Sequence, residues 1–397
     1  MSDMNEYKIE KITDLGTVNR GKSKHRPRND SILYGGEYPF IQTGDVKKAN
    51  LHLVDYTQTY NDVGLKQSKL WKKGTLCFTI AANIADSAIL GMDACFPDSI
   101  VGFLPYENVS DTTYVKYLFD ELKLYFQQIS KGTTQDNLSL DKICRVKLRV
   151  PDYDTQVKVA SILSTYDTAI ENNNKRIRLL EQMTENLYKE WFVRFRFPGY
   201  EDVEFEEKKP RGWQVGTEDK KHFAPTIFRY DEFGTIGSFV RGKNITAAQM
   251  IEGNIPVISA GLQPSGYHNE ANVFGENLTI SASGANAGYL QYNLNDIWAA
   301  DCSYYQDDAT IWFVYNTLKY LQPVINNLQC GAAQPHVYPK NINRLCILIP
   351  TEELIHKYND SVKPYYDEIK VLNQHNQLLT QQRDLLLPRL MSGKLEV

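Results

Sequence analysis

Residues 79–90 (TIAANIADSAIL) align without a gap to residues 279–290 (TISASGANAGYL), and this pair of segments decides the architecture. Four further pairs match in the same order along the chain: LGTVNRGK (15–22) with IGSFVRGK (236–243), PFIQTG (39–44) with PVISAG (256–261), GTTQ (132–135) with GAAQ (331–334), and ICR (143–145) with INR (342–344). A long internal repeat constrains a fold more strongly than any single motif does. The sequence therefore predicts a tandem duplication of a unit of about 200 residues, whose two copies have diverged.

The composition indicates a globular, multi-domain protein. The chain has 397 residues, 42% apolar and 23% charged, enough for two or three domains that each bury a core. Its formal net charge is −4, so any surface that binds nucleic acid must be local. The most apolar stretch, residues 76–92, is interrupted by Asn83 and Asp86 and predicts no membrane-spanning helix. Residues 1–11 lack the pattern of a signal peptide, so we expect a soluble, cytoplasmic protein.

The six cysteines lie far apart in the sequence. None forms a Cys-x-x-Cys pair, and no histidine stands at the spacing of a zinc ligand. This pattern is typical of reduced, buried thiols, and we expect neither a disulfide framework nor a metal site.

Each copy of the repeat has two parts. Residues 1–150 and 212–349 contain short β-branched and aromatic runs broken by Gly, Pro and Asn, which predict two α/β domains rich in strands and loops. The expected strands include residues 38–43, 76–81, 278–283 and 310–314. Residues 151–197 and 350–397 are predicted to form long helices, and residues 198–211 an acidic linker. The fold class is therefore α+β, with two tandem α/β domains and a pair of long helices.

The two helical segments share a heptad phase. Their apolar positions alternate at spacings of three and four, as in the seam of a coiled coil, with polar interruptions at Asn173, Thr184, Asn376 and Arg383. The predicted seam consists of Leu163, Tyr166, Ile170, Asn173, Ile177, Leu180, Leu187, Val362, Tyr365, Ile369, Leu372, Asn376, Leu379 and Leu386. Because the chain runs domain, helix, domain, helix, the helices must be antiparallel if they pair. We expect the second helix to end at Leu387, before Pro388. In the alternative, each helix simply caps its own domain.

With this order of domains and helices, the chain resembles the specificity subunit of a type I restriction-modification system (the HsdS family) over nearly its whole length. The resemblance rests on the architecture and on three segments: LYKEWFVRFRFPG (187–199), PRGW (210–213) and LLLPRLMSGKLEV (385–397). It implies two target-recognition domains, each reading one half of a bipartite double-stranded DNA target. It also implies that the helices form a spacer and dock two methyltransferase subunits, through which restriction subunits join.

A cluster of cations follows the first repeated segment. Residues 16–23 (GTVNRGKS) match the phosphate-loop pattern GxxxxGK[ST], but the sequence that follows is unsuited to a helix start, and the second copy has Asn244 in place of Ser or Thr. We interpret the stretch as a DNA-facing loop, since alternating cations suit backbone phosphates. The predicted phosphate contacts are Arg20, Lys22, Lys24, Arg26, Arg28, Arg241 and Lys243.

Base reading requires polar side chains on loops, because these match the edges of bases in the major groove. The candidates in the first domain are Gln42, Thr43, Asp45, Asn83, Asp86 and Gln135. The candidates in the second domain are Ser259, Gln263, Ser283, Asn286, Gln334 and His336. The second domain is acidic, with seven Lys and Arg against eleven Asp and Glu in residues 212–340, so we expect part of its DNA affinity to come from partner subunits.

Catalytic motifs are missing from the sequence. It has no Pro-Pro dipeptide of the Asn-Pro-Pro-Tyr methyltransferase type, no GxGxxG opening a helix, no HExxH and no GxSxG. We therefore predict a non-catalytic DNA-recognition subunit that itself holds no cofactor, with S-adenosylmethionine, ATP and Mg²⁺ on partner chains. Two alternatives remain open: a nucleotide-binding enzyme that uses the phosphate-loop match, and a coiled-coil scaffold without a role on DNA.

Overall fold

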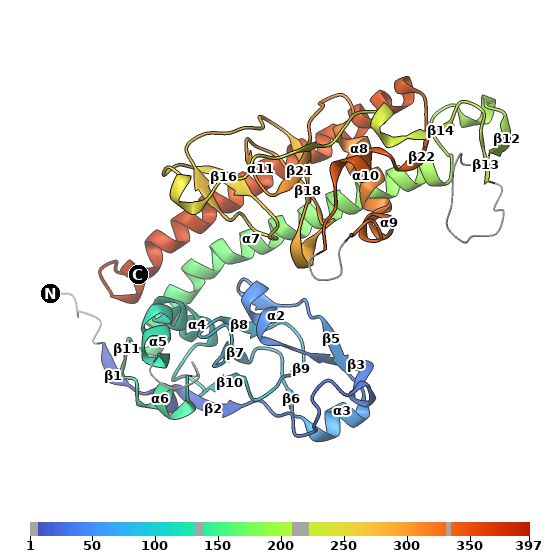
Figure 1. Ribbon diagram of the computed structural model, residues 1–397. Coiled ribbons are helices and arrows are strands. Elements are labelled where there is room, and N and C mark those ends of the chain that lie inside the picture. Colours follow the sequence, from blue (N-terminus) through green and yellow to red (C-terminus); the bar gives the residue numbers. More distant parts are fainter. Residues whose placement is uncertain (1–6, 132–137, 209–221, 331–334) are drawn as a thin grey trace. The chain divides into compact units, whose positions relative to one another are not determined.

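The computed structural model describes residues 7–131, 138–208, 222–330 and 335–397, and it divides into two compact units (Figure 1). Unit 1 is Met1–Lys175 together with Asn373–Val397, and unit 2 is Arg176–Leu372. Each unit therefore contains one strand-rich domain and a part of each long helix. The boundaries predicted from the sequence placed the helices outside the domains, whereas the compact units include them.

Unit 1 is built on two main sheets. The first has the order β2-β10-β7-β8-β4, formed by β2 (Gly16–Arg20), β10 (Ile100–Pro105), β7 (Leu76–Thr79), β8 (Ser87–Leu90) and β4 (His52–Leu53). The second has the order β5-β3-β9-β6, formed by β5 (Gln58–Tyr60), β3 (Tyr34–Phe40), β9 (Ala94–Cys95) and β6 (Leu70–Trp71). A two-stranded ladder pairs β1 (Lys8–Glu10) with β11 (Leu148–Val150). The helices are α1 (Ile12–Leu15), α2 (Thr43–Lys48), α3 (Asp62–Gln67), α4 (Thr112–Glu121), α5 (Lys123–Ser130) and α6 (Leu140–Arg145).

Unit 2 repeats this topology, without strands equivalent to β4 and β6 among its described residues. Its main sheet, β15-β21-β18-β19, consists of β15 (Val240–Arg241), β21 (Cys302–Tyr305), β18 (Asn277–Ser281) and β19 (Leu290–Asn293). Its second sheet, β17-β16-β20, consists of β17 (Gly266–His268), β16 (Ile255–Ile258) and β20 (Trp298–Ala299). The ladder β14 (Arg229–Glu232) with β22 (Cys346–Ile349) corresponds to β1 with β11, and the helices are α8 (Ile311–Tyr320), α9 (Gln322–Asn326) and α10 (Pro339–Asn343).

The order and the direction of the strands agree between the two units. The pairs β2·β10, β10·β7 and β7·β8 are antiparallel, as are β15·β21, β21·β18 and β18·β19. The pair β3·β9 is parallel, and so is β16·β20. The duplication predicted from five short matches is thus confirmed at the level of topology, and so is the α+β fold class.

The long helices begin in the same way. The carboxylate of Asp152 accepts a hydrogen bond from the Thr155 backbone N–H at 3.0 Å, one residue before α7 (Tyr153–Tyr188). The hydroxyl of Thr351 accepts one from the Leu354 N–H at 3.4 Å, one residue before α11 (Glu352–Met391). Such side-chain caps satisfy N–H groups that the first helical turn leaves free. The hydrogen bond from the Thr155 backbone holds the pKa of Asp152 below its ordinary value, and the Asp152 cap is charged at neutral pH.

The two helices pair in antiparallel fashion within each unit. In unit 1, Asp167 of α7 contacts Arg383 of α11, and Asn173 Nδ2 donates to Asn376 Oδ1 at 2.9 Å. In unit 2, Arg176 contacts Glu368, and the Thr184 and Tyr366 hydroxyls lie 3.1 Å apart. The alternative in which each helix caps only its own domain is therefore wrong. All of the predicted seam residues are buried or half-buried.

The predicted end of the second helix is wrong. Helix α11 continues through Pro388 to Met391, and Pro364 also lies inside it. A proline removes one N–H donor, but Leu390 and Met391 beyond Pro388 are only 1% and 6% exposed in the core of unit 1. We infer that this burial offsets the lost hydrogen bond.

Three other expectations need correction. Residues 310–314 were expected as a strand but begin α8, because Ile311–Leu318 is buried on all sides and a continuous apolar run does not distinguish a strand from a buried helix. The expected linker 198–211 contains β12 (Phe205–Lys208), which pairs with β13 (His222–Pro225). The six cysteines form no disulfide, but Cys330 is exposed, and Cys144 and Cys346 are half-buried rather than buried.

Candidate nucleic-acid interface

The repeated segment GTVNRGK/GSFVRGK forms the edge of the main sheet in each unit. In unit 1, Arg20 ends β2 opposite Val101, and the next N–H group, from Gly21, donates to Ile100 O at 2.8 Å. A Cβ on Gly21 would lie 2.3 Å from Pro97 O, so the close approach of the chain requires a glycine. The chain directly after Arg20 is thereby fixed, and Lys22 follows on the exposed surface.

The same edge occurs in unit 2. Arg241 ends β15 opposite Ser303, and Gly242 donates to Cys302 O at 2.9 Å. A Cβ on Gly242 would lie 2.5 Å from Ala300 O. The structure thus brings Arg20 with Lys22, and Arg241 with Lys243, to equivalent positions.

The extended backbone of this segment does not support the phosphate-loop alternative. Residues Gly16–Arg20 pair along their whole length with β10, and irregular chain follows them up to residue 30. A phosphate loop instead curls its backbone N–H groups around the anion and leads into a helix. Ser23, which would hold the metal in that pattern, is only 6% exposed.

The five predicted phosphate contacts of unit 1 differ in whether other groups of the protein already bind their charged side chains. All five are exposed, and the described residues place no acidic partner on Arg20, Lys22 or Lys24. The Arg28 guanidinium binds both carboxylate oxygens of Asp98, at 2.7 and 2.9 Å. Arg26 donates to backbone carbonyls of its own loop. The first three are therefore the better candidates for phosphate contacts.

Three predicted residues gather around one open cavity in unit 1. The cavity has a volume of about 290 Å³ and is lined by Arg28, Gln42 and Thr43, together with Ser23, Asn29, Tyr34, Phe40, Gln58, Pro97 and Ser99. Gln42 Nε2 donates to Gln58 Oε1 at 2.6 Å. Burial, with a contribution from Tyr60, raises the pKa of Tyr34 to about 12, so its hydroxyl keeps its proton and donates to Arg28 O. The site thus offers amide and hydroxyl groups of the kind that match base edges.

Asp45 is unsuited to base reading. Its side chain is buried, and its carboxylate accepts the Gln42 backbone N–H at 2.8 Å at the start of α2. It acts as a helix-capping residue.

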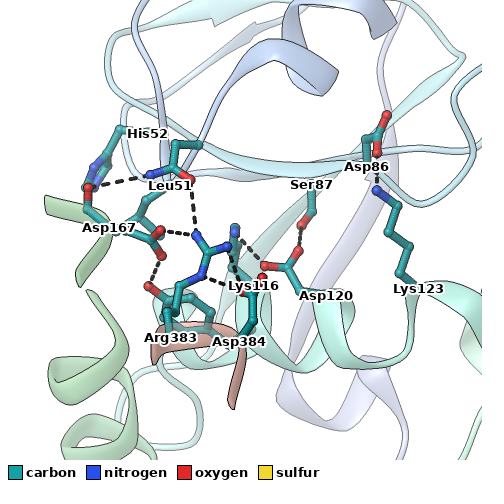
Figure 2. Close-up of polar contacts among 12 residues, drawn as sticks. Leu51, His52, Asp86, Ser87, Lys116, Asp120, Lys123, Asp167, Arg383 and Asp384 are labelled. Carbon is teal, nitrogen blue, oxygen red and sulfur yellow. Dashed lines mark hydrogen bonds and ion pairs between the residues drawn. The ribbon is translucent and has the colours of Figure 1, made fainter. Parts of the chain in front are cut away.

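Asn83 and Asp86 line a different cavity. It has a volume of about 380 Å³ and is also lined by Lys47, Ala82, Ile84, Lys123, Gln127, Ser130 and Lys131. Asp86 is paired with Lys123 at 2.6 Å. In Figure 2, Lys123 points at Asp86, and the neighbouring Ser87 donates to Asp120, which also binds Lys116. The first-unit candidates therefore divide between two surfaces, and Gln135 lies outside the described residues.

In unit 2, Asp301 holds two of the predicted residues. Its two carboxylate oxygens accept from Arg241 and from the Ser283 hydroxyl. Asn286 Nδ2 donates to Ala260 O at 3.4 Å, next to the half-buried Ser259. Gln263 is exposed, the His336 and Tyr338 rings lie 6.0 Å apart, and Gln334 is outside the described residues. Asp301 was not predicted from the sequence, because a contact between residues 60 positions apart leaves no local pattern.

Two further properties concern cofactors and membranes. Among the described residues, no group of three or more His, Cys, Asp or Glu side chains is arranged to hold a metal ion. None of the helices in the described ranges combines the length and the apolar character needed to cross a membrane.

The fold and the repeated polar edges define a class of protein, a duplicated recognition subunit with one reading domain in each unit. The family model described as type I restriction modification DNA specificity domain matches residues 4–182 and 226–381, so the chain belongs to this family of specificity subunits. It is 26% identical to the type I restriction enzyme MjaIX specificity subunit of Methanocaldococcus jannaschii, over 99% of this chain and 94% of that protein. It is 24% identical to the type I restriction enzyme HindI specificity subunit of Haemophilus influenzae, over the full length of both.

A solved structure shares the fold. The type I restriction-modification S subunit from M. genitalium superposes with a TM-score of 0.58 at 16% identity, covering 98% of this chain and 97% of that one. The family predicted from the domain order and the helix-end segments is thus confirmed.

Proposed function

We propose that this chain is the non-catalytic DNA sequence-recognition subunit of a type I restriction-modification complex, and that its two domains read the two halves of a bipartite target. The observation that carries the proposal is that equivalent sheet edges present different side chains in the two units. Arg20 is free of acidic partners among the described residues, whereas Arg241 is bound to Asp301. Two readers of one topology but different surface chemistry suit two different half-sites.

The paired helices would set the distance between the half-sites. For both domains to meet one face of the duplex, the half-sites should lie about one helical turn apart. Inserting four residues at equivalent points of α7 and α11 would add about 6 Å of helix, which corresponds to about two base pairs of unread sequence. Sequencing of methylated adenines in cells that carry the variant measures this gap. An unchanged gap in a correctly folded variant would contradict the spacer role.

The helices also present surfaces suited to partner subunits. Leu179 of α7 and Leu378 of α11 occupy equivalent positions of the repeat and are 53% and 55% exposed. Two exposed leucines at matching positions of the repeat suit two copies of one partner. We propose that they dock two methyltransferase subunits, which supply S-adenosylmethionine, and that restriction subunits with ATP and Mg²⁺ join through these.

Native mass spectrometry of the co-expressed complex tests the docking. Wild-type chain should carry two methyltransferase subunits, Leu179→Lys and Leu378→Lys one each, and the double variant none. Asn186→Lys, at another exposed position of α7, is the control and should keep two. Two bound copies in the double variant would contradict these docking sites without affecting the DNA-reading role.

A further inference from the structure

Asp301 links two predicted DNA contacts at the edge of unit 2. One carboxylate oxygen accepts from Arg241 Nη2 at the end of β15, and the other accepts from the hydroxyl of Ser283. Ser283 is 8% exposed and Asp301 is about a quarter exposed, whereas the Arg241 side chain is 43% exposed. The buried Ser283 hydroxyl therefore fixes the Asp301 carboxylate, and the Arg241 guanidinium that this carboxylate binds faces solvent.

This arrangement makes Arg241 a poor phosphate contact. The adjacent carboxylate neutralises its charge, so little counterion release would follow from binding a phosphate. The same carboxylate fixes the direction of a planar group that has five N–H donors. Among the described residues, Asp301 is the one polar partner of this guanidinium, which leaves N–H donors for a ligand.

Among the described residues of unit 1, no carboxylate binds the equivalent arginine, Arg20. Asp301 lies two residues before Ser303, the strand partner of Arg241, and Ser99 lies two residues before Val101, the strand partner of Arg20. The neighbouring acid, Asp98, is bound by Arg28. No described residue compensates the charge of Arg20 or fixes its side chain, whereas Asp301 does both for Arg241.

A planar, oriented guanidinium with its charge compensated is suited to bidentate hydrogen bonding with the O6 and N7 atoms of guanine in the major groove. We propose that Arg241 reads a guanine in the half-site of unit 2, with Asp301 and Ser283 as positioning residues. This inference rests on the proposed function, and it replaces the sequence-based assignment of Arg241 to a phosphate.

Selection from a DNA library tests the proposal. The probe is double-stranded DNA with randomised positions, bound by the full chain in complex with its methyltransferase subunits and then sequenced. Wild type should select a bipartite motif with a guanine in one half. Arg241→Ala should reduce the preference at that one position by about tenfold or more and leave the other positions unchanged. Arg241→Lys should keep more of the overall affinity than Arg241→Ala but only part of the guanine preference, because an ammonium can donate to guanine but lacks the planar fork.

Asp301→Asn separates the positioning role from a structural one. It keeps the shape of the side chain but frees the charge of Arg241. The guanine preference should weaken, while the slope of log affinity against log salt should steepen by up to about one. If Asp301 only maintained the fold, its substitution would not weaken the guanine preference and steepen the salt slope at the same time. Arg229→Ala is the matched control, since Arg229 is paired with Asp231 in the same unit, and it should change neither property.

Two outcomes would overturn the inference. In one, Arg241→Ala weakens binding equally for all sequences and lowers the salt slope, which would make Arg241 a phosphate contact. In the other, the guanine preference survives in Arg241→Ala. Failure of the proposed function looks different, because wild-type chain would then select no sequence at all. Thermal unfolding of each variant distinguishes these outcomes from misfolding, and if Arg241→Ala is unstable the Arg241→Lys result decides.

Discussion

In each unit, polar side chains of α7, α11 and one helix of the strand-rich domain meet at one point, which we call the joint. The two units build this joint from different chemistry. In unit 1, Asp167 of α7 is fully buried, and its carboxylate accepts a hydrogen bond from Arg383 of α11 (Figure 2). It also accepts one from the Tyr117 hydroxyl of α4. Arg383 also reaches Asn50 at 3.3 Å. Burial opposes the charge of Arg383, but Asp167 and Asp384 outweigh it and raise the pKa of this guanidinium further. The joint of unit 1 is therefore ionic.

In unit 2 the joint is neutral. Tyr366 of α11 takes the place of the carboxylate, and its hydroxyl lies 3.1 Å from both Thr184 of α7 and Asn316 Nδ2 of α8. Its ring stacks on Trp312 with the centroids 3.5 Å apart. The residues of the two joints correspond in the repeat, because each pair is 199 residues apart: Tyr117 with Asn316, Asp167 with Tyr366, and Thr184 with Arg383. Duplication has kept the position of the joint while its chemistry diverged.

The difference matters because an ionic joint tolerates the loss of one partner least. Removing one member of a buried ion pair leaves a charge without compensation, whereas removing a neutral hydroxyl leaves a smaller desolvation cost. The pairing of α7 with α11 should therefore depend on a few charged atoms in unit 1 and on aromatic packing in unit 2.

The largest effect is expected for Arg383→Leu. It leaves the buried Asp167 carboxylate unpaired and should lower the stability of unit 1 by about 3–5 kcal/mol. Hydrogen exchange measured by mass spectrometry on the full chain reports each unit separately. The matched control is Thr184→Leu in unit 2, with an expected loss of about 1 kcal/mol. Equal losses for the two variants would contradict the ionic character of the joint, and Asp167→Asn added to Arg383→Leu should recover part of the loss.

A smaller contrast is expected between Tyr117→Phe and Tyr366→Phe. Burial, and then the charge of Asp167, raises the pKa of Tyr117 well above its ordinary value, so its hydroxyl donates to the carboxylate at neutral pH. Removing a bond to a charged group should cost about 2 kcal/mol, against about 1 kcal/mol for the neutral bonds of Tyr366. Both variants keep the aromatic ring, so packing changes little. Hydrogen exchange in α4 and α8 measures the two losses, and a larger loss for Tyr366→Phe would reverse the interpretation.

Much of this architecture could be predicted because local patterns encode it. The heptad spacing identified Asn173 and Asn376 as polar interruptions, and these two side chains bond to each other. The same spacing assigned Tyr365 to the seam, yet Tyr366 is the fully buried residue, because its ring stacks on Trp312 of a helix that the heptad pattern does not include. Contacts made by tertiary packing leave no period in the sequence.

The candidate site was less predictable for the same reason. Arg241 was assigned to a phosphate from its residue type, but its charge is compensated by Asp301, 60 residues further along the chain. Asp45 was chosen as a polar loop residue, and the structure uses it to cap a helix. The residue type tells which hydrogen bonds and charges a side chain can offer. Its burial and its partners in the fold decide whether these groups are accessible to a ligand.

A pH effect confined to unit 1 would sharpen the comparison further. His52 Nδ1 lies 3.0 Å from Glu171 of α7, and the hydrogen bond to Glu171 raises the pKa of His52. The stabilisation is then fully present below about pH 6.5 and is lost as the pH rises through the raised pKa of the folded state. Since His52 is 41% exposed, solvent screening limits the effect to about 0.5 kcal/mol. Unit 2 has Lys370 at the position of Glu171 and so lacks the pair.

Hydrogen exchange at pH 6 and pH 8 measures this difference. Wild-type unit 1 should lose protection near β4 at the higher pH, and Glu171→Gln should remove most of that change. A pH response of the same size in Glu171→Gln would assign the effect to another group.

The smallest effect concerns the free charge of Arg20. Ser99→Asp would give Arg20 the carboxylate that Arg241 receives from Asp301, since both positions lie two residues before the strand partner of the arginine. Neutralising one phosphate contact should lower the salt slope of DNA binding by somewhat less than one, with the same selected sequence as in Ser99→Asn. Ser99→Asn, which has similar size and no charge, is the control. If Ser99→Asp instead creates a new guanine preference in the first half-site, the carboxylate alone converts a phosphate contact into a base reader, and the difference between the two edges comes down to a single side chain.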